Sequence, residues 1–128
     1  MLELLQLEQR RCLRGLRTML LAQMDIDHFK SINDTYGHGV GDIALCAFAQ
    51  VVCDNIRSSD VLARWGGEEF VLLLSDTDVA GAMLTLQRVR AAVEQAVITG
   101  VPAELKMTVS MGLAEHIPGE MFEVTLDR

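Results

Sequence analysis

The sequence has no apolar run near the roughly 18 residues that are needed to span a bilayer, and it does not open with an export signal. Its 10 glycines and 2 prolines are too few for a collagen-like or Pro/Gly-rich disordered chain. A chain of 128 residues can bury roughly two-thirds of its unfolded surface, which suffices for a core without staples. We therefore expect one globular domain over residues 1–128, with no membrane contact.

Cysteines and basic residues are also scarce. Because Cys12, Cys46 and Cys53 are odd in number and lack C-x-x-C spacing, we expect no disulfide framework and a cytoplasmic location. The 11 Lys and Arg residues oppose 18 Asp and Glu, for a formal net charge of −7. A nucleic-acid polymer is not an expected partner, because binding one requires a basic surface that releases counterions. A single nucleotide is compatible with this charge, since metal ions and one or two cationic side chains can hold its phosphates.

Apolar periodicity predicts alternating helices and strands. Helices are expected over residues 1–17, 28–36, 43–52 and 79–97, and strands over residues 18–24, 60–65, 70–74 and 107–113. Between the two middle strands, Gly66-Gly67 predicts a two-residue hairpin turn, because such turns need the positive φ that glycine adopts freely. This order predicts an α+β fold: a ferredoxin-like split β-α-β-β-α-β sheet flanked by helices, with one extra helix after the first strand.

The densest polar cluster, residues 25–42, directly follows the first predicted strand. If that strand continues, Asp25 and Asp27 point to the same face, where their charges raise each other's pKa or recruit a cation. A divalent metal would relieve this repulsion, while two solvated acids at a strand end are an equally open alternative. A calcium loop is excluded, because Phe29 and Lys30 occupy its fifth and sixth positions.

The glycines of this cluster allow two interpretations. Residues 39–44 match the loose form of the dinucleotide-binding fingerprint, but a helix rather than a strand is expected before them. No Walker loop is present, because neither Gly-Lys-Ser nor Gly-Lys-Thr occurs. The glycines could leave backbone N–H groups free for an anion or a base edge at the start of the next helix, or form a plain turn.

A second polar cluster is centred on the predicted hairpin. Adjacent strand residues point to opposite faces, so Glu68 and Glu69 cannot address one site equally. If the first strand is the neighbour of this hairpin, Asp25 and Glu68 converge with no lysine between them; solvated acids at a hairpin tip are the alternative. Upstream, Arg57 and Asp60 form either a surface ion pair or an anion site in which the arginine grips phosphate.

Together the two clusters resemble the GGDEF family, the diguanylate cyclases. Residues 66–70 read GGEEF, and residues 25–42 follow the family pattern D-x-D-x-F-K-x-I-N-D-x-x-G-H-x-x-G-D. Residues 108–112 are similar to the late T-V-S-x-G. The resemblance covers roughly residues 18–114 and implies a sheet like that of nucleotidyl cyclases and polymerase palms. The family's usual first turn and last helix are missing, so we expect a single catalytic domain truncated at both ends and short of cationic phosphate ligands.

The resemblance implies that two GTP molecules are condensed into cyclic di-GMP, with release of two pyrophosphates, by a homodimer whose subunits each hold one GTP. It implies Mg²⁺ or Mn²⁺ held by Asp25, by the backbone carbonyl of Ile26 and by Glu68. Glu68 is also the candidate to take the proton of the 3′-hydroxyl. A GGDEF sensor that binds GTP or cyclic di-GMP without catalysis, and signals through a partner, is the alternative.

Further contacts are implied by the same resemblance. Asn33 and Asp42 would recognise guanine, His38 would lie beside the nucleoside, and Lys30 would touch phosphate. A product-inhibition site for cyclic di-GMP is implied by three more residues on two segments. These are Arg57, Asp60, and Arg88 or Arg90 from the following helix.

Overall fold

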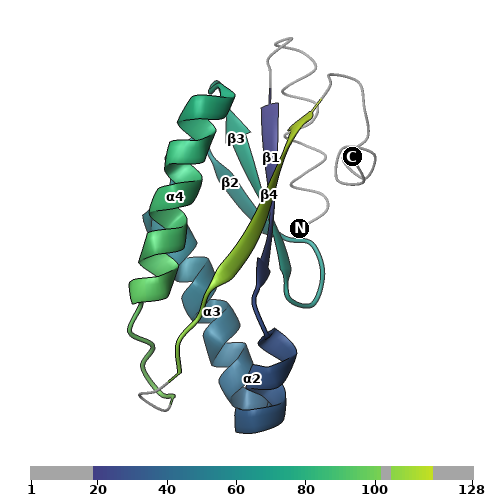
Figure 1. The fold of residues 1–128 in the computed structure, drawn as a ribbon, viewed down its shortest axis with the longest axis vertical. Coiled ribbons are helices and arrows are strands. Elements are labelled where there is room, and N and C mark those ends of the chain that lie inside the picture. The colour runs from purple at the N-terminus through teal and green to yellow at the C-terminus, as the bar shows by residue number, and fades with distance from the viewer. Residues whose placement is uncertain (1–18, 102–104, 117–128) are drawn as a thin grey trace.

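The protein is described here by a computed structural model that covers residues 19–101 and 105–116 (Figure 1). Its elements, in chain order, are β1 Met19–Ile26, α2 Phe29–Tyr36, α3 His38–Asp54, β2 Val61–Arg64, β3 Glu69–Ser75, α4 Val79–Gln95 and β4 Val109–His116. The order confirms the predicted α+β fold, including the extra helix after the first strand. The helix predicted over residues 1–17 lies outside the described residues. No helix in the described part of the chain is long and apolar enough to cross a membrane.

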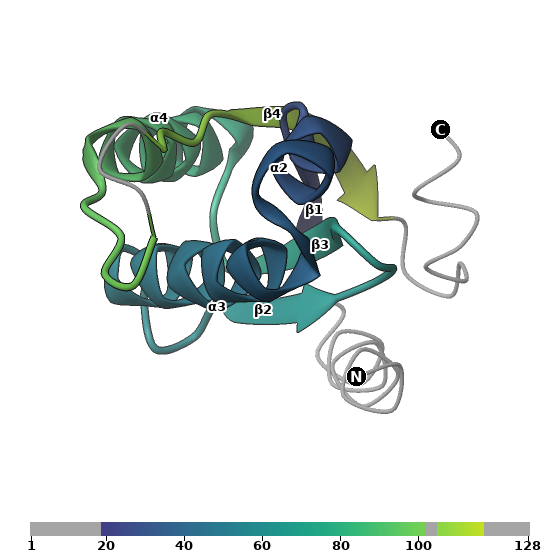
Figure 2. The same ribbon diagram turned by 90° about the horizontal axis from the view of Figure 1, so that it is seen from below.

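The sheet has the strand order β2-β3-β1-β4, and every neighbouring pair is antiparallel. Helices α3 and α4 lie together over one face, while α2 sits at one end of the sheet (Figures 1 and 2). The central strand β1 therefore lies between β3, which follows the GGEEF hairpin, and β4. The first strand is thus the neighbour of the hairpin, which is the condition under which Asp25 and the hairpin glutamates were expected to approach each other.

Apolar side chains fill both faces of the central strands, which explains why β1 reads as a nearly continuous apolar run. On the helical face, the large core is exemplified by Met24, Leu72 and Phe48, all less than 1% exposed. The Phe48 ring of α3 contacts the Phe70 ring of β3 with a centroid distance of 5.0 Å. On the other face lies a smaller cluster of buried residues: Met19, Leu21, Ala63, Val71 and Leu73.

Several predicted boundaries are wrong by a few residues. β1 extends to Ile26, because its main chain continues to pair with β4 through Val109, so Asp25 belongs to the strand itself. Helix α3 starts at His38, which places the glycines at 39 and 41 inside a helix instead of in a turn. Only Gly37 between the two helices has a positive φ, of 91°.

Candidate active site

The C-terminal end of β1 carries the first predicted site residues. Asp25 lies opposite Glu69 of β3 and opposite Ser110 of β4. Since opposite residues of a ladder share a face, all three belong to the sheet face that α3 and α4 leave open. The Oδ1 atom of Asp25 is buried and has no hydrogen-bond partner. A buried carboxylate oxygen without a partner is unfavourable, so this atom is suited to a cation.

Asp27 has a different environment. Its carboxylate accepts hydrogen bonds from the Thr108 hydroxyl at 2.7 Å and from the Ser110 hydroxyl, and its N–H donates to the Thr108 carbonyl at 3.0 Å. The hydroxyls of Ser110 and then Thr108 lower the pKa of Asp27 below 3.8. The prediction that Asp25 and Asp27 raise each other's pKa is therefore wrong for Asp27, because strand β4 supplies donors that the sequence spacing does not reveal.

These bonds predict a pH-dependent contribution of Asp27 to stability. Because the folded state lowers the pKa of Asp27 from 3.8, the stabilisation is fully present above that pH and is lost as the pH falls through the folded pKa. Asp27→Asn removes this titration. We expect the urea midpoint of wild type to fall more steeply than that of Asp27→Asn between pH 5 and pH 3. Parallel curves for the two proteins would contradict the assignment.

The hairpin between β2 and β3 differs from the predicted turn. It is a four-residue loop, residues 65–68, and neither Gly66 nor Gly67 has a positive φ. The N–H groups of Trp65 and Gly66 donate to the Glu69 carbonyl at 2.8 and 3.2 Å. The Arg64 guanidinium donates to the carbonyls of Gly66 at 3.2 Å and Gly67 at 3.1 Å. Arg64 thus stabilises the loop, and this role is apparent only from the tertiary structure.

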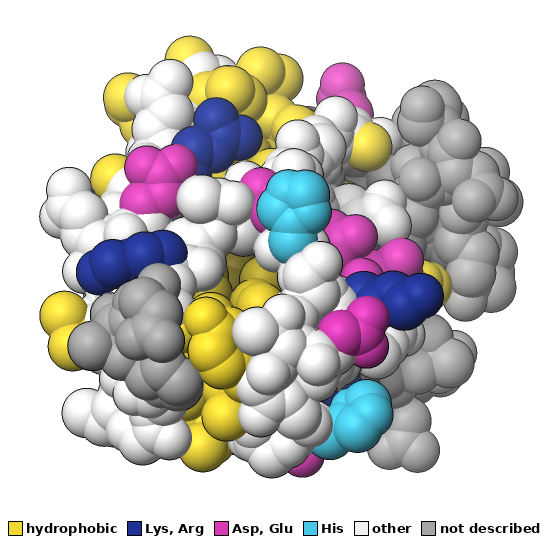
Figure 3. Space-filling view, turned by 60° about the horizontal axis from the view of Figure 1, so that its bottom comes forward, with side chains coloured by type: hydrophobic (Ala, Val, Ile, Leu, Met, Phe, Trp, Pro, Cys, Tyr) yellow, Lys and Arg dark blue, Asp and Glu magenta, His cyan; other side chains and the backbone are white. Residues whose placement is uncertain are grey.

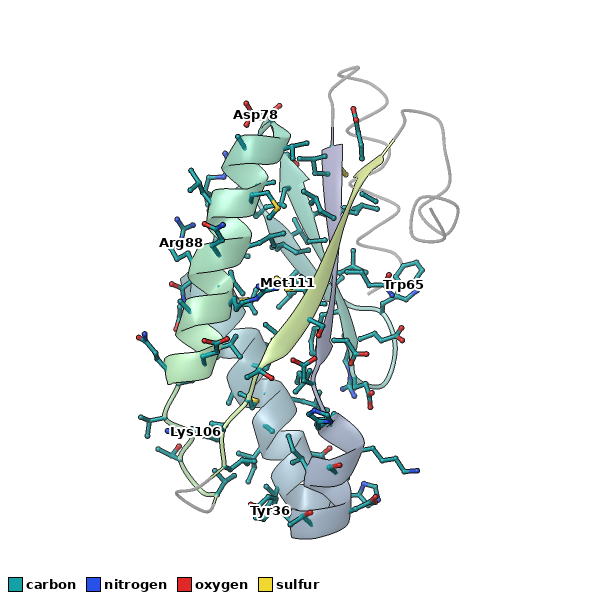
Figure 4. The ribbon with its side chains drawn as sticks, viewed as in Figure 1. Tyr36, Trp65, Asp78, Arg88, Lys106 and Met111 are labelled. Atoms are coloured by element: carbon teal, nitrogen blue, oxygen red, sulfur yellow. The ribbon has the colours of Figure 1, made fainter. Side chains whose placement is uncertain are left out.

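The two glutamates of the hairpin are not equivalent. The ladder places Glu69 opposite Asp25, but its Oε2 lies 3.5 Å from the position of a Cβ on Gly66, so the carboxylate is turned back over the loop. Glu68 is half-buried in the loop itself. The choice of Glu68 as the partner of Asp25 stays a prediction, which the family resemblance implies. Trp65 lies on the sheet side away from α4 (Figure 4) and packs on the smaller apolar cluster.

The donor set at this end of the sheet suits a hard divalent cation. Among the residues that the structure describes, no three His, Cys, Asp or Glu side chains gather closely enough to hold a metal by themselves. The donors that the resemblance implies, two carboxylates and a strand-end carbonyl, would leave further positions to phosphate oxygens and water. Mg²⁺ is typically held in this way, by one or two carboxylates together with substrate phosphates.

Helices α2 and α3 pack closely through a glycine. A Cβ on Gly41 would lie 1.8 Å from Asn33 Oδ1 and 3.3 Å from Phe29 Cζ, so only glycine fits. The Gly41 N–H donates to the Gly37 carbonyl at 3.1 Å, so it is not free for an anion. The glycine instead brings the Asn33 carboxamide next to the chain at Asp42. Asp42, the other predicted guanine-binding residue, directly follows Gly41 in α3.

Gly41→Ala is therefore expected to lower the free energy of unfolding by about 1–3 kcal/mol, because the methyl group displaces Asn33. Gly39→Ala is the matched control in the same helix. A Cβ there meets nothing within 4 Å, so we expect a gain of about 0.5–1 kcal/mol from the reduced entropy of the unfolded chain. Urea denaturation measures both, and effects of the same sign would contradict the packing argument.

The remaining predicted substrate residues are exposed at the end of the molecule formed by α2 and the start of α3. Lys30, His38 and Asp42 all have exposed side chains. Figure 3 shows acidic, basic and histidine side chains gathered on one surface at this end. The fold thus brings the predicted phosphate and nucleoside contacts to the end of the sheet that carries Asp25.

Arg57 and Asp60 form an ion pair that is supported by further hydrogen bonds. The guanidinium donates to Asp60 Oδ1 at 3.1 Å, the Arg57 N–H donates to Oδ2 at 3.0 Å, and the Asp60 side chain is fully buried. Arg57 also donates to the Ser75 carbonyl at 2.7 Å. With its side chain 45% exposed, the arginine still reaches solvent. The ion-pair interpretation is confirmed, and the anion site remains a prediction.

The structure separates the two candidate arginines of α4. Arg88 donates to the Asn55 carbonyl at 2.8 Å, two residues before Arg57, and it points outward from α4 in Figure 4. Arg90, after the hydroxyls of Ser110 and Thr108, contributes to the lowered pKa of Asp27. Arg88 is therefore the residue that accompanies Arg57.

Comparison with known proteins supports the resemblance. The chain matches the family described as "Diguanylate cyclase, GGDEF domain" over residues 1–127. It is 39% identical to diguanylate cyclase A of Treponema denticola over 99 residues, covering 77% of this chain and 27% of that protein. With diguanylate cyclase DgcM of Escherichia coli the identity is 42% over 108 residues, covering 84% and 26%. The chain thus spans about a quarter of the length of these relatives.

Solved structures show the same fold. Diguanylate cyclase SiaD from Pseudomonas aeruginosa, solved with its activator SiaC, has a TM-score of 0.88 at 42% identity, covering 98% of this chain and 48% of that one. The coiled coil and GGDEF domain of DgcB from Caulobacter crescentus, solved with c-di-GMP, has a TM-score of 0.82 at 31% identity, covering 94% and 64%. A family match over nearly the whole chain and a shared fold at 42% identity lead to one conclusion: this chain belongs to the diguanylate cyclase GGDEF domain family.

Proposed function

We propose that this chain is the catalytic domain of a cytoplasmic diguanylate cyclase, which condenses two GTP molecules into cyclic di-GMP and releases two pyrophosphates. The observation that carries the proposal is the buried, unpartnered Oδ1 of Asp25, which lies beside the strand that follows the GGEEF hairpin. A carboxylate in this state is suited to a cation that accompanies a polyanionic substrate. The relatives named diguanylate cyclase supply the reaction class.

In the proposed site, Asp25, the Ile26 carbonyl and Glu68 would hold Mg²⁺ or Mn²⁺. The bound ion would neutralise triphosphate oxygens and lower the pKa of a coordinated hydroxyl. Lys30 would add positive charge at the phosphates, as an exposed side chain on α2. Asn33 and Asp42 would bond the guanine edge, and His38 would lie beside the nucleoside.

Each reaction step joins two nucleotides held by two subunits. The 3′-hydroxyl oxygen of one GTP attacks the α-phosphorus of the other, a P–O bond forms, and the bond to the β-phosphate breaks with release of pyrophosphate. Glu68 accepts the hydroxyl proton. The 3′-hydroxyl oxygen of the second nucleotide then attacks the α-phosphorus of the first in the same way. This second step releases the second pyrophosphate and closes the ring. The proposed enzyme acts as a homodimer, because the described part of one chain offers one proposed guanine-binding pair, Asn33 and Asp42.

The Arg57, Asp60 and Arg88 group would bind the product. Asp60 is fully buried and fixes the Arg57 guanidinium, whose exposed part could contact a phosphate. Arg88 lies next to the same loop through its bond to Asn55. Cyclic di-GMP bound there would couple to the active site, and by linkage each site would change the affinity of the other.

The test is to incubate the purified chain with GTP and Mg²⁺ and to measure cyclic di-GMP and pyrophosphate by chromatography. Two GTP consumed for each cyclic di-GMP formed, no product from ATP, and no product after chelation of the metal are expected. The same assay on a longer protein, in which the family's first turn and last helix flank this domain, separates a truncated enzyme from a nucleotide sensor. Tight GTP binding without product by that protein would overturn the catalytic proposal and favour the sensor.

A further inference from the structure

Two carboxylates, those of Asp25 and Asp27, lie at the end of β1 near the hydroxyls of Thr108 and Ser110. Ser110 lies opposite Asp25 in the β1–β4 ladder, and Cβ atoms of opposite residues are typically about 4.5–5.5 Å apart. The Ser110 hydroxyl is therefore within reach of the Asp25 carboxylate. It nevertheless donates to Asp27, on the diagonal, and Asp25 Oδ1 keeps no partner.

The position of Asp27 makes this choice possible. Its N–H donates to the Thr108 carbonyl at 3.0 Å, which holds the main chain just after β1 against the start of β4. The Thr108 hydroxyl donates to Asp27 Oδ2 at 2.7 Å, and the Ser110 hydroxyl donates to Oδ1. Both oxygens of Asp27 are thus engaged, and both hydroxyls of this strand edge are directed to one carboxylate.

We infer that Asp27 is a positioning residue that captures the Ser110 hydroxyl and so keeps Asp25 Oδ1 available to a divalent cation. The inference rests on the proposed function, because the cation is the one proposed for Asp25, Ile26 and Glu68. Without Asp27, the Ser110 hydroxyl turns to its ladder partner Asp25. The cation must then displace a hydrogen bond that the wild-type site does not contain.

The experiment measures the dissociation constant of Mn²⁺ alone by electron paramagnetic resonance on the full chain. We expect Asp27→Ala to weaken Mn²⁺ binding about 10–100-fold, the range for partners that orient metal ligands. Asp27→Asn, which keeps the shape of the side chain, is expected to change it in the same direction. Thermal unfolding confirms that each variant is folded.

The double variant Asp27→Ala with Ser110→Ala separates positioning from mere structural support. Removing the Ser110 hydroxyl leaves Asp25 Oδ1 unpartnered again, so Mn²⁺ affinity should return to within about threefold of wild type. This remaining difference is much smaller than the loss expected for Asp27→Ala alone. A purely structural Asp27 predicts that the double variant binds as weakly as Asp27→Ala or more weakly. That result would overturn the inference, as would unchanged affinity in both Asp27 variants.

Asp25→Asn distinguishes this inference from the proposed function. It should abolish measurable Mn²⁺ binding, whatever the role of Asp27. If Asp25→Asn binds Mn²⁺ as well as wild type, the proposed metal site is wrong and the inference falls with it. If Asp25→Asn loses binding while the Asp27 variants do not, the metal site stands and only the inference is overturned.

Discussion

Glu68→Gln should lower the rate of cyclic di-GMP synthesis by about 10²–10⁴-fold, the range for loss of a positioned general base. The amide could neither accept the proton of the 3′-hydroxyl nor contribute negative charge to the proposed metal site. The substitution keeps the size of the side chain, and Glu68 is only half-buried, so stability should be nearly unchanged. Steady-state formation of cyclic di-GMP at saturating GTP measures the effect.

Glu69→Gln is the matched control, one residue further along the chain. The Glu69 carboxylate is turned back over Gly66, and its main-chain carbonyl accepts the loop hydrogen bonds, which the substitution does not remove. A much smaller loss of rate is therefore expected. Glu69 is the residue opposite Asp25 in the ladder. If Glu69→Gln lowered the rate more than Glu68→Gln, Glu69 would be the catalytic residue and the assignment of Glu68 would be wrong.

Phe48→Ala is expected to lower the free energy of unfolding by about 3–5 kcal/mol, the usual cost of removing a buried phenylalanine. Phe48 is fully buried and its ring contacts Phe70, directly after the GGEEF glutamates. Since single domains are stable by only about 5–15 kcal/mol, the variant should lose a large part of its stability. Urea denaturation followed by circular dichroism gives the value.

Leu84→Ala provides the control for the loss of a large apolar side chain. Leu84 is on α4 and 67% exposed, so its truncation should change the free energy of unfolding by no more than about 0.5 kcal/mol. A comparable loss in both variants would show that Phe48 does not occupy the core described above. A cavity at Phe48 should also disturb the adjacent hairpin, because α3 supports β3 through this ring pair.

Patterns with strong local causes were predictable. The nearly continuous apolar run of β1 predicted a strand buried on both faces, and the structure places apolar clusters on both. Residues 79–97 predicted a helix that is observed as Val79–Gln95. The start of this helix was also predictable, because aspartate is a preferred N-cap residue. The Asp78 carboxylate caps the helix by accepting from the Gly81 N–H at 2.8 Å.

Patterns with tertiary causes predicted local structure that differs from the structure observed. The glycines at 39 and 41 read as helix breakers, yet α3 begins at His38 because packing against α2 outweighs their low helix propensity. Gly66 and Gly67 predicted a two-residue turn with positive φ, whereas a four-residue loop braced by Arg64 is observed. The only sign of this interaction in the sequence is that an arginine directly precedes the hairpin.

The order of residues by itself determined the family, the alternation of helices and strands, and the acidic clusters, because these depend on periodicity and on neighbouring residue types. Only the tertiary structure decided which acid keeps a free oxygen. Asp25 and Asp27 are equivalent in spacing, but Thr108 and Ser110, 81 and 83 residues further along, donate to Asp27 alone. Hydrogen bonds between distant segments depend on strand register, and register is set when the sheet packs against its helices.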